Sequence, residues 1–329
     1  MVSARMRAVN GNPGEIPPRI ASFDVPKPGN REVLVRVAAA GLNRADLSQL
    51  KGRYPAPPGA SKILGLEVAG TIVEMGPGAT RWREGDEVCA LLSGGGYAEY
   101  CSVPEGQCLL KPTELTMIEA ASLPEACATV QNALWRTGAL QAGESVLFHG
   151  GVSGIGAIAL QVASARGHRI YATAGTEAKC SLAVQLGAEQ AINYRTNDFA
   201  LEVLAATGNR GVDVIVDMVG GSYLKRDMAC TAANGRIVVI SFLDGNQAEI
   251  DLRVMMTREI SLLVASIRYQ SIEYKSELIG EVEQNIWPLI NAGRVRPVID
   301  QVLPFEEVAA AHELMQKGNH SGKLVLQIA

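Results

Sequence analysis

A glycine-rich turn, His149-Gly150-Gly151-Val152-Ser153-Gly154-Ile155-Gly156, constrains the fold of this chain more than its other stretches do. The apolar run at 145–148 leads into it and predicts a short buried strand. Apolar residues recur after the turn at helical spacing, and Gly167 follows where such a helix would end. At a strand-to-helix turn, backbone N–H groups and the positive end of the helix favour phosphate binding. The stretch therefore predicts a dinucleotide site.

The small residues of this turn have distinct predicted roles. Gly151 allows the tight turn, and Gly156 lets the helix pack close to the strand. Ser153 replaces the middle glycine of the G-x-G-x-x-G pattern; it is small enough for close approach, and its hydroxyl is expected to bond a phosphate oxygen. Gly154 and Ile155 begin the helix and are counted with the expected cofactor contacts.

The end of the next predicted strand favours NADPH over NADH. NAD sites usually have Asp or Glu there, about twenty residues after the glycines, to bind the ribose 2′-hydroxyl. This chain has Ala174-Gly175-Thr176 instead, and Glu177 is the only acid nearby. A 2′-phosphate is accommodated at Gly175, and Lys179 is placed to pair with it. The alternative interpretation is that Lys179 is a solvated helix residue and Gly175 a plain loop glycine.

Composition is that of an ordinary globular protein. The length of 329 residues predicts about two domains, and an apolar fraction of 47% suffices for their cores. With 30 basic against 34 acidic residues and 5% aromatics, we expect neither a nucleic-acid nor a membrane-surface partner. The start is too polar for a signal peptide, no apolar run would span a bilayer, and the six cysteines include no C-x-x-C pair. A cytoplasmic location is therefore expected.

The predicted elements divide the chain into two parts. The first third contains short strands punctuated by Gly and Pro, typical of a small barrel or sandwich. From Ser145 onward strands and helices alternate, which predicts a doubly wound parallel sheet. We expect strands at 145–149, 169–173, 190–193, 212–217, 236–241 and 260–266, and helices at 154–166, 177–186, 198–207 and 222–232. Helices over 273–292 and 305–317 follow, and a last strand at 323–327 is expected to return to the first domain.

Six motifs carry a family resemblance: GLNRADL at 41–47, GLEVAG at 65–70, VEMG at 73–76, GDEV at 85–88, GGYAEY at 95–100 and the closing GK at 322–323. Together they resemble the medium-chain dehydrogenase/reductase superfamily, and within it the zinc-free quinone oxidoreductases related to zeta-crystallin. The stretch 52–67 resembles the branch of tumour-suppressor-inducible quinone oxidoreductases. The resemblance implies an α/β protein with a discontinuous GroES-like β-rich catalytic domain over 1–124 and 268–329, and a Rossmann NADPH-binding domain over 125–267.

The resemblance also implies hydride transfer from NADPH to a quinone or enone without zinc. Zinc-dependent alcohol dehydrogenases carry Cys and His where this chain has Asn43 and Leu66, and leucine is no zinc ligand. Their third ligand falls near 125–127, where Cys127 alone does not complete a site. Their structural-zinc lobe is missing after Tyr97. No metal site is therefore expected.

Three residues are expected to act on the substrate. By resemblance, Asn43 and Asp46 line the nicotinamide and substrate cleft, and Tyr54 is placed to hydrogen-bond the substrate oxygen. Each has a local alternative: Asn43 as a turn cap, Asp46 as a helix N-terminal acid, and Tyr54 as a packed amphipathic aromatic.

Further cofactor contacts are expected beyond the carboxyl ends of the strands. These are Tyr194 after the third strand of the alternating region, Val219 and Gly220 after the fourth, and Ser241, Phe242 and Leu243 after the fifth. An exposed strand-end tyrosine is the alternative for Tyr194. The resemblance adds Thr129 with Val130, Arg268 and Lys323. The four histidines form no evident constellation.

The apolar strand at 260–265 would leave an open sheet edge, so a homodimer through the edge strands of the Rossmann sheets is expected. Two alternative functions remain open. One is an alkenal or enoyl-thioester reductase on the same scaffold. The other is an NADPH-binding regulatory protein with little turnover.

Overall fold

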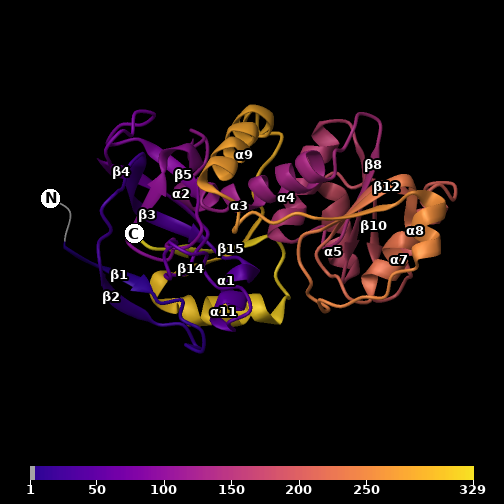
Figure 1. Ribbon diagram of the computed structural model, residues 1–329, viewed down its shortest axis with the longest axis horizontal. Helices are drawn as coiled ribbons and strands as arrows, with labels where there is room; N and C mark the ends of the chain where they lie inside the picture. Colours follow the sequence, from indigo (N-terminus) through magenta and orange to yellow (C-terminus); the bar gives the residue numbers. More distant parts are fainter. Residues whose placement is uncertain (1–3) are drawn as a thin grey trace. The chain divides into compact units, whose positions relative to one another are not determined.

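The computed structural model describes residues 4–329, and the chain forms two compact units (Figure 1). The first unit comprises Met1–Ala128, Arg268–Asn291 and Pro297–Ala329, and the second comprises Thr129–Ile267 and Ala292–Arg296. The first has a GroES-like β-rich architecture and the second that of a Rossmann domain, as the predicted fold class requires. The division between them falls inside helix α3 (Pro124–Val130), slightly later in the chain than the predicted boundary at residue 124.

The first unit is built on a seven-stranded sheet. Its path runs through β14 (Ile299–Pro304), β15 (Lys323–Gln327), β3 (Glu32–Gly41), β4 (Glu67–Met75), β5 (Glu87–Leu91) and β7 (Cys108–Leu110), with β6 (Tyr100–Pro104) also paired to β3. The terminal strand β15 pairs antiparallel with β3, which confirms that it returns to this unit. A separate antiparallel hairpin joins β1 (Arg5–Val9) and β2 (Ile20–Asp24). Helices α1 (Arg44–Leu50), α2 (Met117–Ala120) and α11 (Val308–Lys317) pack around the sheet, and α1 lies beside α11.

The second unit is a six-stranded parallel sheet in the order β10-β9-β8-β11-β12-β13. Its strands are β8 (Ser145–Phe148), β9 (Arg169–Ala174), β10 (Gln190–Asn193), β11 (Val212–Asp217), β12 (Thr231–Val239) and β13 (Ser261–Val264). The connecting helices are α4 (Gly154–Ala165), α5 (Glu177–Gln185), α6 (Phe199–Ala206), α7 (Tyr223–Cys230) and α8 (Leu252–Arg258). The strand order reverses between β8 and β11, and ligands of open α/β sheets bind beyond the carboxyl ends of the strands at such a point. The glycine-rich turn follows β8 directly at this position.

Most predicted elements are present, and the long helix predicted over 273–292 is divided. It forms α9 (Ile272–Asn285) and α10 (Trp287–Asn291), which are separated at Ile286. Pro288 explains the break, because proline lacks the N–H that a continuous helix would need and disfavours helical backbone before it. Shorter elements that the periodicity does not reveal are the 3₁₀ turns η1 (Glu105–Gln107) and η3 (Phe305–Glu307) and the π-helical turn η2 (Gln131–Thr137). Over residues 4–329, the helices are all too short or too polar to cross a membrane.

Candidate functional site

In the glycine-rich turn of the second unit, the backbone at Gly156 lies close to the backbone of Gly150 and Gly151. Gly150 has a φ of +71°, so the left-handed residue of the turn is Gly150, the neighbour of the Gly151 to which the sequence assigns the tight turn. At Gly151 a Cβ atom would lie 2.6 Å from the Cβ of Ala172, which shows why this position excludes a side chain. At Gly156 a Cβ would collide with the carbonyl oxygen of Gly150. The first turn of α4 therefore packs closely at Gly156, against the loop that follows β8 and not against the strand itself.

Ser153 is the N-cap of helix α4. Its Oγ accepts a hydrogen bond from the backbone N–H of Gly156 at 3.0 Å, the geometry of a helix N-cap. Gly154 and Ile155 stand in the first turn, where backbone N–H groups have no partner inside the helix. The turn thus presents backbone donors and the positive end of a helix, which suit a pyrophosphate. The contact between the Ser153 hydroxyl and phosphate stays a prediction.

The loop after β9 gathers polar side chains at Gly175. A Cβ atom there would lie 2.8 Å from the Tyr194 hydroxyl and 3.4 Å from Nε of Arg195. Both residues follow β10, the neighbour of β9, and both are exposed. Arg195 makes no ion pair within residues 4–329. Sequence reasoning missed Arg195, although its place directly after Tyr194 at a strand end was a usable signal.

The acid nearest this loop is already engaged. Glu177 accepts a hydrogen bond from the side-chain amide of Asn193 at 2.7 Å. Thr176 caps α5 by accepting from the backbone N–H of Lys179 at 3.2 Å. This cap places Lys179 in the first turn of α5, as predicted. The loop therefore combines a guanidinium and a phenol with a carboxylate that is held by an amide.

The remaining predicted contacts of this unit lie on loops that meet beyond β11 and β12. The Asp217 carboxylate accepts from the backbone N–H groups of Val219 at 2.6 Å and of Gly220 at 3.0 Å. The backbone N–H of Leu243 donates to the carbonyl of Met218 at 3.2 Å. The structure thus brings together the segments 217–220 and 241–243, which carry Ser241 and Phe242. Thr129 lies in α3, and its role toward the cofactor stays a prediction.

His149 belongs to a buried network with Asp227 and Thr173 that contains no second histidine. Its Nε2 lies 2.8 Å from Oδ1 of Asp227, and its Nδ1 lies 3.0 Å from the Thr173 hydroxyl. That hydroxyl also accepts from the backbone N–H of Gly150 at 3.3 Å. Burial raises the pKa of Asp227. The network connects α7 to the glycine-rich turn, and the sequence did not reveal it because its members lie far apart in the chain.

In the first unit, Asn43 joins a buried ion pair. Its Nδ2 donates to Oε1 of Glu67 at 3.0 Å, and its Oδ1 accepts from Nζ of Lys323 at 2.8 Å. Lys323 also pairs with Glu67, whose second oxygen accepts from the backbone N–H of Glu125 at 3.0 Å. Glu67 is fully buried and Lys323 is 5% exposed. The roles predicted for Asn43 toward the substrate and Lys323 toward the cofactor remain predictions.

The Asp46 carboxylate is buried and accepts three hydrogen bonds. It accepts from the backbone N–H groups of Asn43 at 2.9 Å and Gly65 at 3.1 Å, and from the Tyr97 hydroxyl at 2.7 Å. Burial raises the pKa of its carboxyl. These bonds match the local alternative, a helix N-terminal acid, because Asp46 and Asn43 form the capping box of α1.

Tyr54 is held by the start of the segment at 268–275. The Arg268 guanidinium donates to the carbonyl oxygens of Tyr54 at 2.9 Å and Ser93 at 3.0 Å, and also bonds Gln49. The Tyr54 ring stands edge-on to Tyr269 with the ring centroids 5.0 Å apart. These contacts fix the Pro-rich loop within this unit. The prediction that Arg268 contacts the cofactor is not tested by them.

Two groups near the ion pair of Glu67 and Lys323 have a raised pKa. Burial raises the pKa of Glu125 to about 8, with a further rise from the nearby charge of Glu67. Burial also raises the pKa of the Cys127 thiol, which is fully buried. Sequence reasoning overlooked both Glu67 and Glu125, because their importance depends on Lys323, far away in the chain.

Comparison with known proteins places this arrangement in a family. Residues 29–113 match the alcohol dehydrogenase GroES-like domain, and residues 186–326 match the family described as zinc-binding dehydrogenase. The quinone oxidoreductase of Rattus norvegicus is 31% identical over 304 residues, which cover 92% of this chain and 91% of the relative. The chain belongs to the medium-chain dehydrogenase/reductase superfamily. Its match to quinone oxidoreductases fits the zeta-crystallin-like resemblance.

Solved structures of this superfamily have the same fold as this chain over almost its whole length. An NAD-dependent alcohol dehydrogenase is 31% identical with a TM-score of 0.86, covering 98% of this chain and 100% of its own. The CurK enoyl reductase is 29% identical with a TM-score of 0.85, covering 99% and 100%. The chain is therefore an oxidoreductase with a small-molecule substrate, and its fold implies a nicotinamide cofactor, NAD or NADP.

Proposed function

We propose that this medium-chain oxidoreductase transfers a hydride from NADPH to quinones without zinc. The observation that carries the choice of cofactor is the group of side chains around Gly175. Arg195 and Tyr194 offer a positive charge and a hydroxyl beside Gly175, where a 2′-phosphate would lie, and charge-assisted bonds to phosphate are strong. We expect Lys179, in the first turn of α5, to contribute a second positive charge. The nearby Glu177 carboxylate is held by Asn193. An NADH-specific site would instead need a free carboxylate for the ribose hydroxyls.

The turn of the second unit fits the rest of the dinucleotide. A side chain at Gly151 or Gly156 would fill the space next to the loop, so the glycines keep this backbone open to a pyrophosphate. In our proposal the backbone N–H groups of Gly154 and Ile155 and the Ser153 hydroxyl bind its oxygens. The bound cofactor would supply the hydride, and the protein contributes binding and orientation.

The donor set of the first unit does not fit catalytic zinc. Leu66 has no ligand atom, and the Asn43 side chain already bonds Glu67 and Lys323. The Lys323 ammonium places a positive charge beside the same oxygens that would bind a cation. Zinc-independent chemistry suits an electrophile such as a quinone, because the anion formed on hydride addition is delocalised. Elemental analysis of protein purified without chelator should find no stoichiometric zinc; zinc that is lost together with activity would contradict this part of the proposal.

The residues proposed to contact the substrate are Asn43 and Tyr54, with Asp46 as a positioning residue. Asp46 fixes the backbone of Asn43, and the ion pair of Lys323 and Glu67 fixes the Asn43 amide. Arg268 fixes the Tyr54 backbone. Such preorganisation matters for hydride transfer, because the reacting atoms must be held in close contact.

An enoyl-thioester or alkenal reductase is the second candidate, favoured by the likeness to the CurK enoyl reductase. The two are separated by steady-state oxidation of NADPH against quinones, alkenals and enoyl thioesters. We expect the highest kcat/KM with a quinone. The highest value with an enoyl thioester would replace the proposal by the second candidate. Tight NADPH binding without turnover of any class would favour a regulatory protein.

We also propose a homodimer formed through β13. This strand ends the six-stranded sheet, and Val264 is 74% exposed beside the half-buried Leu262 and Leu263. An unpaired apolar edge strand favours pairing with a second copy. Light scattering at micromolar concentration should give twice the mass of the chain, and a monomer mass would contradict the dimer.

A further inference from the structure

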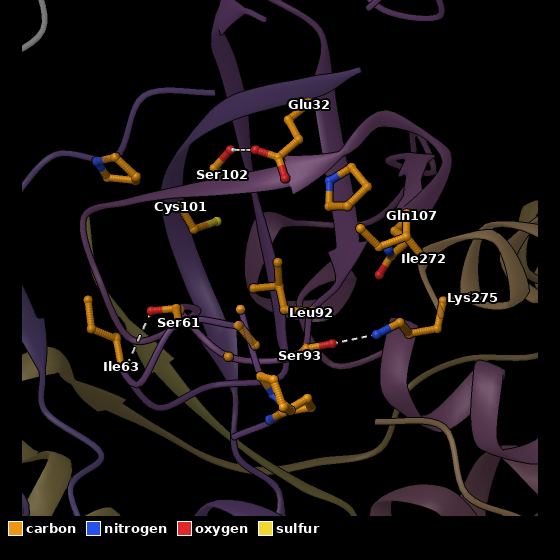
Figure 2. A pocket seen from close by; sticks show the side chains of 18 of the residues that line it. Glu32, Ser61, Ile63, Leu92, Ser93, Cys101, Ser102, Gln107, Ile272 and Lys275 are labelled. Carbon is orange, nitrogen blue, oxygen red and sulfur yellow. Dashed lines mark hydrogen bonds between the residues drawn. The ribbon is translucent and has the colours of Figure 1, made fainter. Parts of the chain in front are cut away.

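A cavity of about 720 Å³ lies within the first unit (Figure 2). It is bordered by the Pro-rich loop at 57–61, the loop at 92–95, strand β6 and the start of α9. Its apolar lining includes Met6, Phe23, Ile63, Leu92 and Ile272. Neither the turn of the second unit nor the Asn43 cluster lines it. The proposed reductase function gives this cavity no role.

One wall of the cavity carries a buried ammonium group. Lys275 is 5% exposed, and its Nζ bonds the Ser93 hydroxyl at 2.6 Å and the carbonyl of Arg268 at 3.5 Å. Within residues 4–329 no carboxylate lies within ion-pair distance of this ammonium. Burial lowers the pKa of Lys275. The charge of Glu125 acts on this ammonium from beyond ion-pair distance and raises its pKa, whereas the groups bonded to it are neutral oxygens. An anion at this wall would therefore add a direct charged partner.

A second polar side chain on this wall lacks partners. Gln107 lines the cavity and is 2% exposed, and the structure gives its carboxamide no hydrogen bond to the described residues. Its amide atoms are not among the unpartnered polar atoms that are closed off from solvent, so they keep access to the open space of the cavity. The Gln107 amide is therefore available to a ligand in the cavity.

Gln107 and Lys275 lie on elements that pack against each other. A Cβ on Gly106 would lie 2.7 Å from the hydroxyl of Ser276, the residue after Lys275. Figure 2 shows Gln107, Ile272 and Lys275 along one side of the cavity, with the Lys275 ammonium directed at Ser93. Both side chains therefore line the same side of the cavity.

The acidic side chains of the cavity are already engaged. Glu32 accepts from the Ser102 hydroxyl at 2.7 Å and from the backbone N–H of Gly29 at 2.8 Å. Asp24 pairs with Arg5. Neither carboxylate is bonded to Lys275, so an anion can approach the ammonium without replacing an internal ion pair.

We propose that this cavity binds a small amphipathic carboxylate. The carboxylate group of this ligand accepts hydrogen bonds from Lys275 and Gln107. The apolar body of the ligand lies along Leu92, Ile63 and Ile272. A carboxylate has the acceptor oxygens for both donors, and the rest of the lining offers apolar contact.

The test uses decanoate as a probe, titrated calorimetrically into the full chain with saturating NADPH to keep the cofactor site filled. Decan-1-ol and decyltrimethylammonium, which share the apolar body, are the comparison ligands. We expect saturable binding of one decanoate per chain, and weaker binding of the alcohol and the cation. Lys275→Met should weaken decanoate binding by roughly tenfold or more and leave decanol binding nearly unchanged, because only the charged bond is removed.

Gln107→Leu is the second variant, which is expected to weaken decanoate binding several-fold. Lys225→Met removes an exposed positive charge from the other unit and should leave decanoate binding unchanged. The NADPH dissociation constant and the circular dichroism spectrum of each variant report whether it is folded. Absence of saturable decanoate binding, equal binding of decanoate and decanol, or wild-type binding by folded Lys275→Met and Gln107→Leu would each overturn the proposal.

Discussion

The buried ion pair of the first unit and the loop at Gly175 of the second unit use their charged groups in opposite ways. In the first, Glu67, Lys323 and Asp46 are buried and find their partners inside the unit. In the second, the loop at Gly175 presents Arg195 and Tyr194 at the surface, and the first turn of α4 presents backbone donors. Groups that are compensated inside a unit stabilise its structure, whereas groups left open at a loop are available to a ligand. Substitutions should therefore affect mainly stability at the ion pair of Glu67 and Lys323, and mainly cofactor affinity at the Gly175 loop.

The largest effect is expected at the buried ion pair. Lys323→Met leaves the Glu67 carboxylate buried without its cation, and removal of one partner of such a pair typically costs about 3–5 kcal/mol. Urea unfolding should be followed in a Trp135→Phe background, because the remaining tryptophans, Trp82 and Trp287, both belong to the first unit. We expect a clearly lower midpoint for Lys323→Met.

The double variant Lys323→Met/Glu67→Gln is the control for this prediction. It removes both charges, so it should recover part of the lost stability. A Lys323→Met variant as stable as wild type would remove the distinction between the two units. A loss of stability in Lys323→Met that the double variant does not reduce would also remove this distinction.

A second large effect is expected in cofactor preference. Gly175→Asp places a carboxylate where the 2′-phosphate is proposed to lie, and offers an acceptor to the ribose hydroxyls of NADH. Since a Cβ at this position would lie 2.8 Å from the Tyr194 hydroxyl, the ring must also move. We expect the NADPH dissociation constant to rise by roughly tenfold or more, with the preference moving toward NADH.

Gly175→Asn is the matched control, because it has nearly the same size without the charge. It should weaken both cofactors to a similar extent. An equal loss of NADPH affinity in the Asn and Asp variants would show that the effect is steric, and the loop would then carry no charge-based selection.

Features that depend on residues close together in the chain could be predicted from the sequence. The turn after β8, the order of alternating strands and helices and the close packing at Gly156 follow from local periodicity and glycine spacing, so they were predictable. The tight turn was assigned to Gly151, whereas Gly150 adopts the left-handed conformation, because the pattern alone does not say which glycine turns the chain. The long helix was predicted as one piece because its apolar spacing continues past Pro288.

The residues that were missed depend on contacts between distant segments. Glu67 gains its importance from Lys323, and His149 from Asp227. No periodicity marks such pairs. Asp46 was recognised, but its local role as a capping acid could be weighed only with the Tyr97 hydroxyl in view.

A smaller effect is expected from pH. His312 is 4% exposed, neither of its ring nitrogens has a partner within residues 4–329, and burial lowers its pKa to about 4. The folded state keeps this ring neutral while the unfolded state takes up a proton below pH ~6.5, so stability is lost as the pH falls from about 6.5 toward 4. The loss should reach roughly 2 kcal/mol between pH 7 and pH 5.

His312→Leu should remove this part of the pH dependence of unfolding in the first unit. The measurement is the urea midpoint of wild type and variant at pH 7 and pH 5 in the Trp135→Phe background. Identical changes of the midpoint with pH in both proteins would contradict the assignment to His312.

The central claim is that the loop at Gly175 selects NADPH through its 2′-phosphate, and calorimetric titration of both cofactors tests it most directly. Wild type should bind NADPH more tightly than NADH. Arg195→Ala and Lys179→Ala should each weaken NADPH binding by ~1–3 kcal/mol and leave NADH binding nearly unchanged, because only NADPH carries the extra charge. Added salt should weaken NADPH binding more than NADH binding. Tighter binding of NADH by wild type, or equal losses of both cofactors in the two variants, would contradict the account.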